Sequence, residues 1–172
     1  MKKISFSEKY GLHQAVLSKE KTMTRRLANT KGPLYSVGEV VAISQRYQDA
    51  GVVFIPEEDE EFGCHNFPAD QTPGWTNKMF VRADLMPHHI RIVKIKLETL
   101  QGITDEDCIK EGITSWICQR KRHYGFFDEV NDKFIPKSTP REAFATLMDK
   151  ISGKGTWESN PLVWVYEFDL ID

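Results

Sequence analysis

Hydrophobic and polar residues alternate most regularly in two segments of the chain, and both patterns predict β-strands. Between residues 90 and 97, apolar residues alternate with lysines, which gives one buried and one solvated face. Between residues 163 and 170, the even-numbered positions are aromatic residues and a leucine and form one apolar face, whereas two valines and Glu167 share the other face. A mostly apolar run at 40–43 has the length of a third strand. Short strands are also predicted at 4–6 and 79–83.

Three further segments carry helix signals. Apolar residues spaced three and four apart predict a helix that begins near Ser7 and ends between residues 18 and 21. Thr104 precedes three acidic residues, which predicts a capped helix to about Glu111. A capping box at 139–142 begins a third helix with one apolar face. Strands and helices do not alternate regularly, so the pattern favours a mixed, curved sheet or small barrel with packed helices over βαβ winding.

Two long segments lack these patterns and predict loops. Residues 48–78 contain three prolines and a run of five acidic residues, and residues 113–138 are rich in aromatic and basic side chains. A chain of 172 residues with 40% hydrophobic content can bury a core of its own. We therefore expect one domain spanning residues 1–172, with loop insertions at about 48–78 and 113–138.

Charge and cysteine content narrow the class of protein. The net charge is −2, so any nucleic-acid site must be a local patch. The three cysteines, Cys64, Cys108 and Cys118, are too few and too irregularly spaced for a disulfide framework, which favours a reducing compartment. The sequence has no run of 18 apolar residues. We expect a cytoplasmic protein that does not span a membrane.

The sequence contains no convincing site for a metal or a nucleotide cofactor. The only local clusters of metal-ligating residues are Cys64-His65, His88-His89 and Cys118 with His123, and none has the spacing of a structural zinc site. The pair Lys21-Thr22 lacks the preceding glycines of a phosphate-binding loop. We expect neither a metal nor another cofactor.

The densest group of polar and cationic residues is KTMTRR at 21–26. Its composition alone fits a solvated helix end, where cations interact favourably with the helix dipole. It also fits the wall of a pocket for a polar or anionic ligand. A threonine hydroxyl becomes a nucleophile only when a base takes its proton, and a lysine acts as that base only if its pKa is lowered. Lys21 and Thr24 form such a pair, and Glu111 is a candidate carboxylate partner, although spacing alone does not bring it near them.

A second basic group lies in the segment 113–138, with aromatic residues on both sides. Cations that bind phosphates and flat rings that stack on bases are what single-stranded RNA recognition requires. The alternative is a solvated loop with hydrophobic anchors, and both interpretations stay open. The candidate nucleic-acid-binding residues are Arg120, Lys121 and Arg122.

Motifs from residue 17 to residue 168 occur in an order typical of one known family. They are LSKEKTMTRR at 17–26, YSVGEV at 35–40, residues 85–97, LQGIT at 100–104 followed by EGI at 111–113, and the closing helix and strand at 144–168. The chain resembles the ASCH domain family of the PUA-like superfamily, in particular its longer bacterial and phage members. The resemblance implies an α+β fold, a small mixed PUA-like β-barrel with flanking helices.

The resemblance also implies a function. ASCH domains are regarded as RNA-related modules, so we expect RNA or a modified nucleoside to bind in a cleft lined by the Lys-Thr-x-Thr-Arg segment. The ligand-binding residues would be Thr22, Arg25 and Arg26.

Two alternatives remain. One short branch of the family resembles a 4-acetylcytidine amidohydrolase, and its lysine, threonine and glutamate fall on Lys21, Thr24 and Glu111, which would make these the catalytic residues. The other alternative is a non-catalytic phage or host interaction module whose long loops carry the partner surface.

Overall fold

The structure is a computed structural model that describes residues 1–52 and 72–172. It divides into two compact units. The small unit comprises Met1–Ser5, Val40–Ile90 and Asp172, and the large unit comprises Phe6–Glu39 and Arg91–Ile171. Within the described ranges, no helix is both long enough and apolar enough to cross a membrane. Every candidate site residue named above belongs to the large unit.

The small unit is built on a short sheet. β1 (Lys2–Ile4) pairs in parallel with β3 (Val40–Ile43), and β3 is followed in the strand order by β4 (His89–Thr99), whose first residues belong to this unit. The strand predicted at 40–43 is confirmed. Most of the loop predicted at 48–78 falls on residues 53–71, outside the described residues.

The rest of the small unit consists of short helical turns. They are α2 (Tyr47–Ala50) and the 3₁₀-helices η2 (Lys78–Phe80) and η3 (Ala83–Leu85). The strand predicted at 79–83 is therefore wrong, because these residues turn twice within eight positions. Their apolar side chains instead close a small core made by Ala42, Tyr47, Val81 and Met86.

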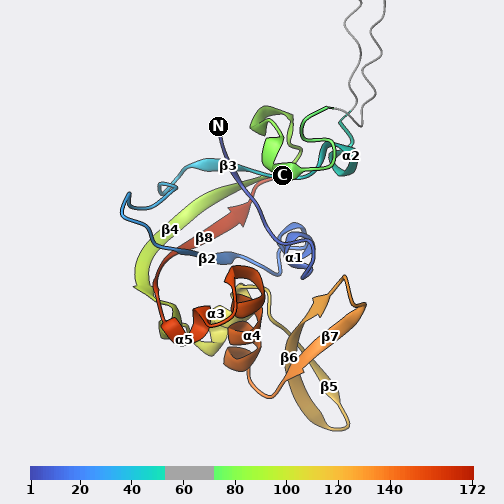
Figure 1. The fold of residues 1–172 in the computed structure, drawn as a ribbon, viewed down its shortest axis with the longest axis vertical. Coiled ribbons are helices and arrows are strands. Elements are labelled where there is room, and N and C mark those ends of the chain that lie inside the picture. Colours follow the sequence, from blue (N-terminus) through green and yellow to red (C-terminus); the bar gives the residue numbers. More distant parts are fainter. Residues whose placement is uncertain (53–71) are drawn as a thin grey trace, which may run out of the picture. The chain divides into compact units, whose positions relative to one another are not determined.

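In the large unit the strand order is β4, β8 (Leu162–Leu170) and β2 (Met23–Leu27). β2 and β8 are neighbouring strands (Figure 1). They are antiparallel, with Arg25 opposite Val165. The strands predicted at 90–97 and 163–170 are confirmed. The buried face predicted for the first of them is wrong in its second half, because Val93 is 42% and Leu97 is 48% exposed. The interpretation of residues 21–26 as a solvated helix end is also wrong, because Met23–Leu27 form β2. The preceding helix stops early because Lys19 has a φ of 63°, and the chain then pairs along β8.

Short helices surround these strands. They are α1 (Leu12–Leu17), η4 (Leu100–Gly102), α3 (Asp105–Lys110), α4 (Pro140–Ser152) and α5 (Thr156–Ser159). The two predicted caps are confirmed, since the side chains of Thr104 and Thr139 accept hydrogen bonds from the backbone three residues on. The first helix begins later than predicted, after a left-handed turn at Gly11.

Residues 113–138 are not a long loop, which corrects the prediction. They form a three-stranded antiparallel sheet of β5 (Thr114–Cys118), β6 (Lys121–Asp128) and β7 (Lys133–Lys137). The tight turn between β5 and β6 puts Gln119 and Arg120 at positive φ, a conformation for which Asn-Gly is the usual sequence signal. The hairpin was missed because that signal is absent.

The fold class is α+β, as predicted. The described strands form two sheets, and neither sheet closes into a barrel.

Candidate functional site

Lys21 and Glu111 form a buried ion pair although they lie 90 positions apart in the sequence. Lys21 Nζ donates to Glu111 Oε2 and to the backbone oxygens of Glu111 and Met23, each at 2.7 Å. The two residues are 2% and 4% exposed. The backbone joins the same two segments, because Thr22 N donates to Lys110 O at 2.9 Å. An ammonium has three N–H donors, so that of Lys21 is fully hydrogen-bonded.

Arg25 joins the same cluster from β2. Its Nη1 donates to Glu111 Oε1 at 3.0 Å, and its Nη2 donates to Glu98 Oε1 at 2.6 Å and to Asp107 Oδ2 at 2.9 Å. Lys96 Nζ lies 3.0 Å from Glu98 Oε2 and 3.5 Å from Asp107 Oδ2. None of the Arg25 side chain is exposed. We call these six residues the carboxylate cluster: Lys21, Arg25, Lys96, Glu98, Asp107 and Glu111.

The cluster shifts the pKa values of its members. Burial favours the neutral form of Asp107, but hydrogen bonds and attraction from Arg25 and Lys96 outweigh it and lower the pKa of Asp107 below its ordinary value. The pKa of Glu98 is lowered in the same way, against burial, by Lys96 and Arg25. The pKa of Lys21 is also lowered, because the effect of burial exceeds the opposing effect of Glu111.

The two faces of β2 carry different chemistry, because side chains alternate along a strand. Met23 and Arg25 lie on one face, where the Arg25 guanidinium is 5.9 Å from the ring of Phe144 on α4. Thr24 and Arg26 lie on the other face. The residues proposed from the sequence as one constellation are thus divided between the two sides of a strand.

The face with Thr24 combines polar and aromatic side chains. Thr24 is directly opposite Tyr166 on β8, and Arg26 is directly opposite Trp164. The pairing continues just before β2, since Phe168 N donates to Thr22 O at 2.9 Å. We call this set the polar-aromatic face: Thr22, Thr24, Arg26, Trp164, Tyr166 and Phe168.

Two features of this face point to a polar ligand. Trp164 Nε1 is buried and has no hydrogen-bond partner among the described residues. Such a buried donor is unusual in a folded protein and requires an explanation. The Arg26 guanidinium also lies 5.9 Å from the ring of Phe6, and Lys21 Nζ lies 6.0 Å from the same ring. Phe6 is therefore near both the cation of this face and a cation of the carboxylate cluster.

Thr24 does not join the ion pair. It is 5% exposed, and among the described residues its hydroxyl makes no hydrogen bond with Lys21 or Glu111. The structure therefore brings together two of the three residues proposed as catalytic. The third, Thr24, lies on the face of β2 that points away from Arg25 and the ion pair.

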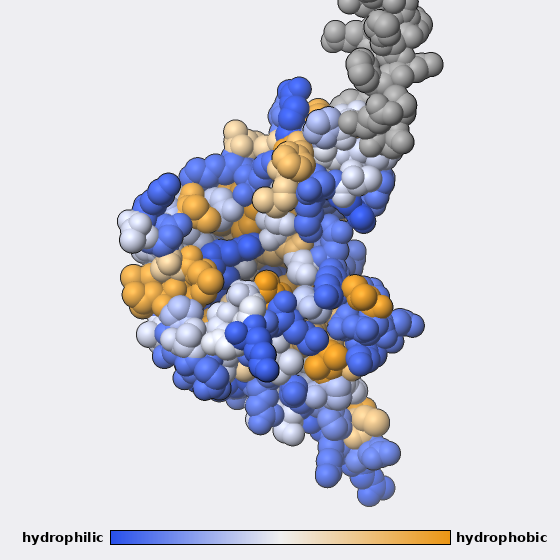
Figure 2. All heavy atoms as spheres, viewed as in Figure 1, coloured by the Kyte–Doolittle hydropathy of each residue, from blue (hydrophilic) through white to orange (hydrophobic). Residues whose placement is uncertain are grey.

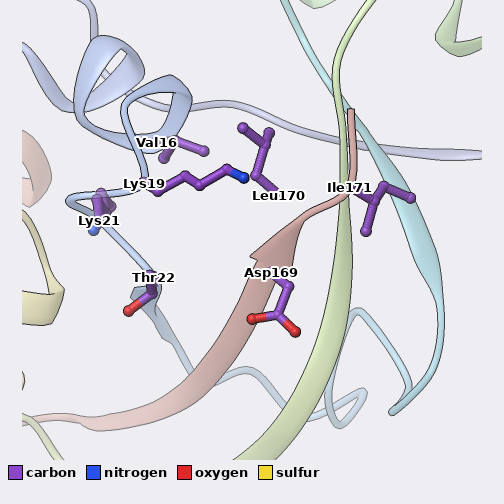
Figure 3. Close-up of a pocket in the computed structure, with 7 residues that line it drawn as sticks. All are labelled: Val16, Lys19, Lys21, Thr22, Asp169, Leu170 and Ile171. Atoms are coloured by element: carbon purple, nitrogen blue, oxygen red, sulfur yellow. The ribbon is translucent and has the colours of Figure 1, made fainter.

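A hollow of about 440 Å³ adjoins the start of β2 (Figure 3). Figure 3 shows the Lys19 side chain reaching toward Leu170, with Thr22 and Asp169 at the neighbouring ends of β2 and β8. Its volume is in the range of small-molecule sites. The lining residues are Val16, Lys19, Lys21, Thr22, Asp169, Leu170 and Ile171.

The remaining candidates take separate positions. Thr22 lines the hollow. Arg25 points its N–H groups at carboxylates and is wholly buried, so this geometry suits holding Glu111 better than contacting a ligand. Arg120, Lys121 and Arg122 are exposed at the tip of the β5–β6 hairpin.

Sequence reasoning missed Glu98, Asp107 and Lys96. From the sequence, Asp107 belongs only to the first turn of a capped helix, Lys96 belongs to the solvated face of a strand, and Glu98 follows the end of that strand without a predicted role. One clue was available, because an arginine that is buried in a strand must find carboxylate partners. The chain did not indicate which carboxylates those were.

Among the described residues, no group of three or more His, Cys, Asp or Glu side chains is placed to hold a metal ion. No protein-family model matches the chain, and it has no match among the curated proteins or the solved structures.

Proposed function

We propose that the large unit binds RNA or a modified nucleoside against the polar-aromatic face, as the resemblance to ASCH domains implies. The observation that carries the proposal is the pairing of Arg26 with Trp164, two half-buried residues opposite each other on β2 and β8. Aromatic rings stack on bases, and hydroxyl and guanidinium groups hydrogen-bond base edges and phosphates. The unpartnered Trp164 Nε1 would donate to an oxygen or ring nitrogen of the base.

The hollow beside Lys21 and Thr22 has the volume of a small-molecule site, and Thr22 is the residue of the polar-aromatic face that lines it. Thr22, Thr24 and Arg26 form a row along one face, so a nucleoside in the hollow would meet the first hydroxyl of that row. The carboxylate cluster contacts β2 from its other face. Because Thr24, Tyr166 and Phe168 are buried, a ligand would reach the polar-aromatic face at its half-buried residues, Thr22, Arg26 and Trp164. A PUA-like barrel around the site is part of this proposal.

The test is calorimetric titration of the protein with cytidine, 4-acetylcytidine and the other common nucleosides. Because a hydrogen bond from a charged group contributes about 1.5–3 kcal/mol, Arg26→Ala should weaken binding about tenfold or more. Lys31→Ala, which removes an exposed cation outside the face, is the matched control and should bind as the wild type does. Unchanged affinity in Arg26→Ala would sink the proposal.

The buried Lys21–Glu111 pair favours a second candidate, an amidohydrolase that deacylates an acylated cytidine or a similar small amide. Lys21 would accept the proton of the Thr24 hydroxyl, and the Thr24 oxygen would attack the acyl carbon. Glu111 would pass a proton to the departing amine, and water would then release the acyl group from Thr24. The lowered pKa of Lys21 suits a base.

This reaction requires a rearrangement, because Lys21 Nζ donates three hydrogen bonds and none of them involves Thr24. Binding is therefore the better-supported function. Incubation with 4-acetylcytidine, followed by detection of released cytidine, distinguishes the two. Absent turnover excludes hydrolysis of that substrate, and equal turnover in Lys21→Ala excludes the mechanism in which Lys21 is the base.

A further inference from the structure

One face of the β5–β7 sheet presents a row of aromatic side chains. Trp116 is opposite His123, and Phe127 is opposite Phe134, so all four lie on the same face. We call these four residues the aromatic row. The ring centroids are 5.9 Å apart for Trp116 and His123, 5.0 Å for Trp116 and Phe134, and 5.1 Å for Phe127 and Phe134.

The row lies on the outer face of this sheet. Phe126 points to the opposite face, is 2% exposed, and contacts the ring of Tyr10 at 5.7 Å. By contrast, Phe134 is 51% exposed, and Trp116 is only half-buried. The core of the large unit therefore uses one face of the sheet and leaves the aromatic row accessible.

Gly125 makes room for the row. It lies between His123 and Phe127 on β6, where an added Cβ would lie 3.3 Å from Trp116 Cη2 and 2.1 Å from Ile135 O. A larger residue here would displace either the indole or the neighbouring strand. The position of the Trp116 indole beside β6 thus depends on a residue without a side chain.

Charge on the same sheet selects the class of partner. Between Thr114 and Phe127 the chain has three cations and no carboxylate, whereas the whole chain has a net charge of −2. The cations are at the tip of the hairpin, and Lys121 points to the face of the aromatic row because it is opposite Cys118. Figure 2 shows mostly hydrophilic atoms over β5–β7, interrupted by separate hydrophobic groups. An extended apolar patch for a protein partner is not what this surface offers.

We propose that the aromatic row and the hairpin tip bind single-stranded nucleic acid. The rings of Trp116 and His123 are nearly parallel, at 27°, whereas Phe134 meets Trp116 at 45° and Phe127 at 68°. Unpaired bases would stack on the exposed faces of these rings. Lys121 and Arg120 would contact the phosphates at one end of the platform. A duplex, whose bases are already stacked, gains nothing from the rings. This surface uses none of the residues of the polar-aromatic face, so it goes beyond the proposed function and does not depend on it.

Substitution of Arg120 should affect stability and binding in opposite directions. It occupies a left-handed conformation with a φ of 63°, which glycine adopts without strain. Arg120→Gly should therefore raise the temperature of unfolding while it weakens binding to an oligonucleotide. A residue with only a structural role would not give both results.

Fluorescence anisotropy with labelled oligonucleotides of about ten nucleotides tests the proposal, because one such site covers about 4–16 nucleotides. Single-stranded RNA, single-stranded DNA and a duplex are compared. Phe134→Ala should weaken single-strand binding at least about fivefold, since stacking contributes about 1–3 kcal/mol per base. Ile117→Ala, which removes an exposed aliphatic side chain from the opposite face, is the matched control and should have no effect.

The salt dependence supplies a second readout. Lys121→Ala should reduce the slope of log affinity against log salt by about 0.7, the value for one phosphate contact on a single strand. Lys133→Ala, on the opposite face, should leave the slope unchanged. Preference for RNA over DNA would show a role for the 2′-hydroxyl, and equal binding would show recognition by stacking alone; both support the surface. The proposal is overturned if no oligonucleotide binds, which would leave a protein contact as the use of the row. It is also overturned if the duplex binds as tightly as the single strand, or if Phe134→Ala binds like the wild type. Nucleoside titration of Phe134→Ala reports separately on the polar-aromatic face.

Discussion

Lys21 Nζ lies 2.7 Å from Glu111 Oε2, and both residues are almost completely buried. The contact joins the segment before β2 to the C-terminal end of α3. Burying two charges is expensive unless each finds good partners, and Glu111 has Lys21 on one oxygen and Arg25 on the other. The pair therefore fixes where β2 begins relative to α3.

Loss of the Glu111 carboxylate should destabilise the large unit strongly. Glu111→Ala leaves Lys21 and Arg25 buried without their shared partner, and breaking a buried pair in this way costs about 3–5 kcal/mol. Urea denaturation measures the free energy of unfolding. Glu106→Gln is the control, because its partner Lys110 lies 3.7 Å away at the surface and the change should cost less than about 1 kcal/mol. Similar losses in the two variants would show that the Glu111 contacts do not stabilise the fold.

Arg25 and Arg26 are neighbours in sequence, but their substitution should have different consequences. Arg25→Ala removes the partner of three carboxylates and should lower the free energy of unfolding by about 3–5 kcal/mol. Arg26→Ala should change it by less and should weaken nucleoside binding instead. Chemical denaturation and calorimetric titration of both variants separate the two effects. The division of roles is wrong if Arg26→Ala unfolds as readily as Arg25→Ala.

Acid should destabilise the carboxylate cluster. The pKa values of Asp107 and Glu98 are lower in the folded state than their ordinary values of 3.8 and 4.5, so the unfolded chain binds more protons as the pH falls. Their contribution is complete above these ordinary values and is lost as the pH drops through the lowered ones. The free energy of unfolding, measured from neutral pH to about pH 3, should therefore fall in this range. Asp107→Asn should give a flatter profile, and an unchanged slope in that variant would contradict the prediction.

Thr24 tests whether a hydroxyl is needed on the polar-aromatic face. Thr24→Val keeps the shape and the strand propensity but removes the hydroxyl, and it should weaken nucleoside binding about fivefold or more because a hydrogen bond contributes about 1 kcal/mol. Thr24→Ser restores the hydroxyl and should recover most of the affinity. If the protein deacylates 4-acetylcytidine, Thr24→Val should also abolish turnover. Equal affinity of the valine and serine variants would exclude a role for the hydroxyl.

The sequence predicted the elements that have strong local signals. The strands at 90–97 and 163–170 and the cap at Thr139 are set by side-chain alternation and by a local hydrogen bond, both visible in the chain. The β5–β6 hairpin has an unusual turn, with Gln119 and Arg120 in left-handed conformations, and local rules gave no sign of it. Its pairing depends on contacts such as that between Phe126 and Tyr10, which are far apart in sequence.

The candidate site was predictable in its residue types but not in its arrangement. A lysine, a threonine and a glutamate were singled out, and the structure brings Lys21 and Glu111 together. The division of Thr24 from Arg25 follows from strand alternation, which residues 21–26 do not reveal because cations occupy both faces. The contact of Glu98 and Asp107 with Arg25 depends on tertiary packing alone.

The most direct test of nucleoside binding is the indole N–H signal of Trp164 in a nuclear magnetic resonance spectrum. The side-chain signals of the four tryptophans are resolved and assigned with Trp164→Phe, and the protein is then titrated with nucleosides. Trp164 Nε1 is buried opposite Arg26 and has no hydrogen-bond partner within residues 1–52 and 72–172. A bound nucleoside that accepts its hydrogen bond should therefore shift this signal and leave that of Trp157 in place. A Trp164 signal that no nucleoside moves would contradict the proposed site.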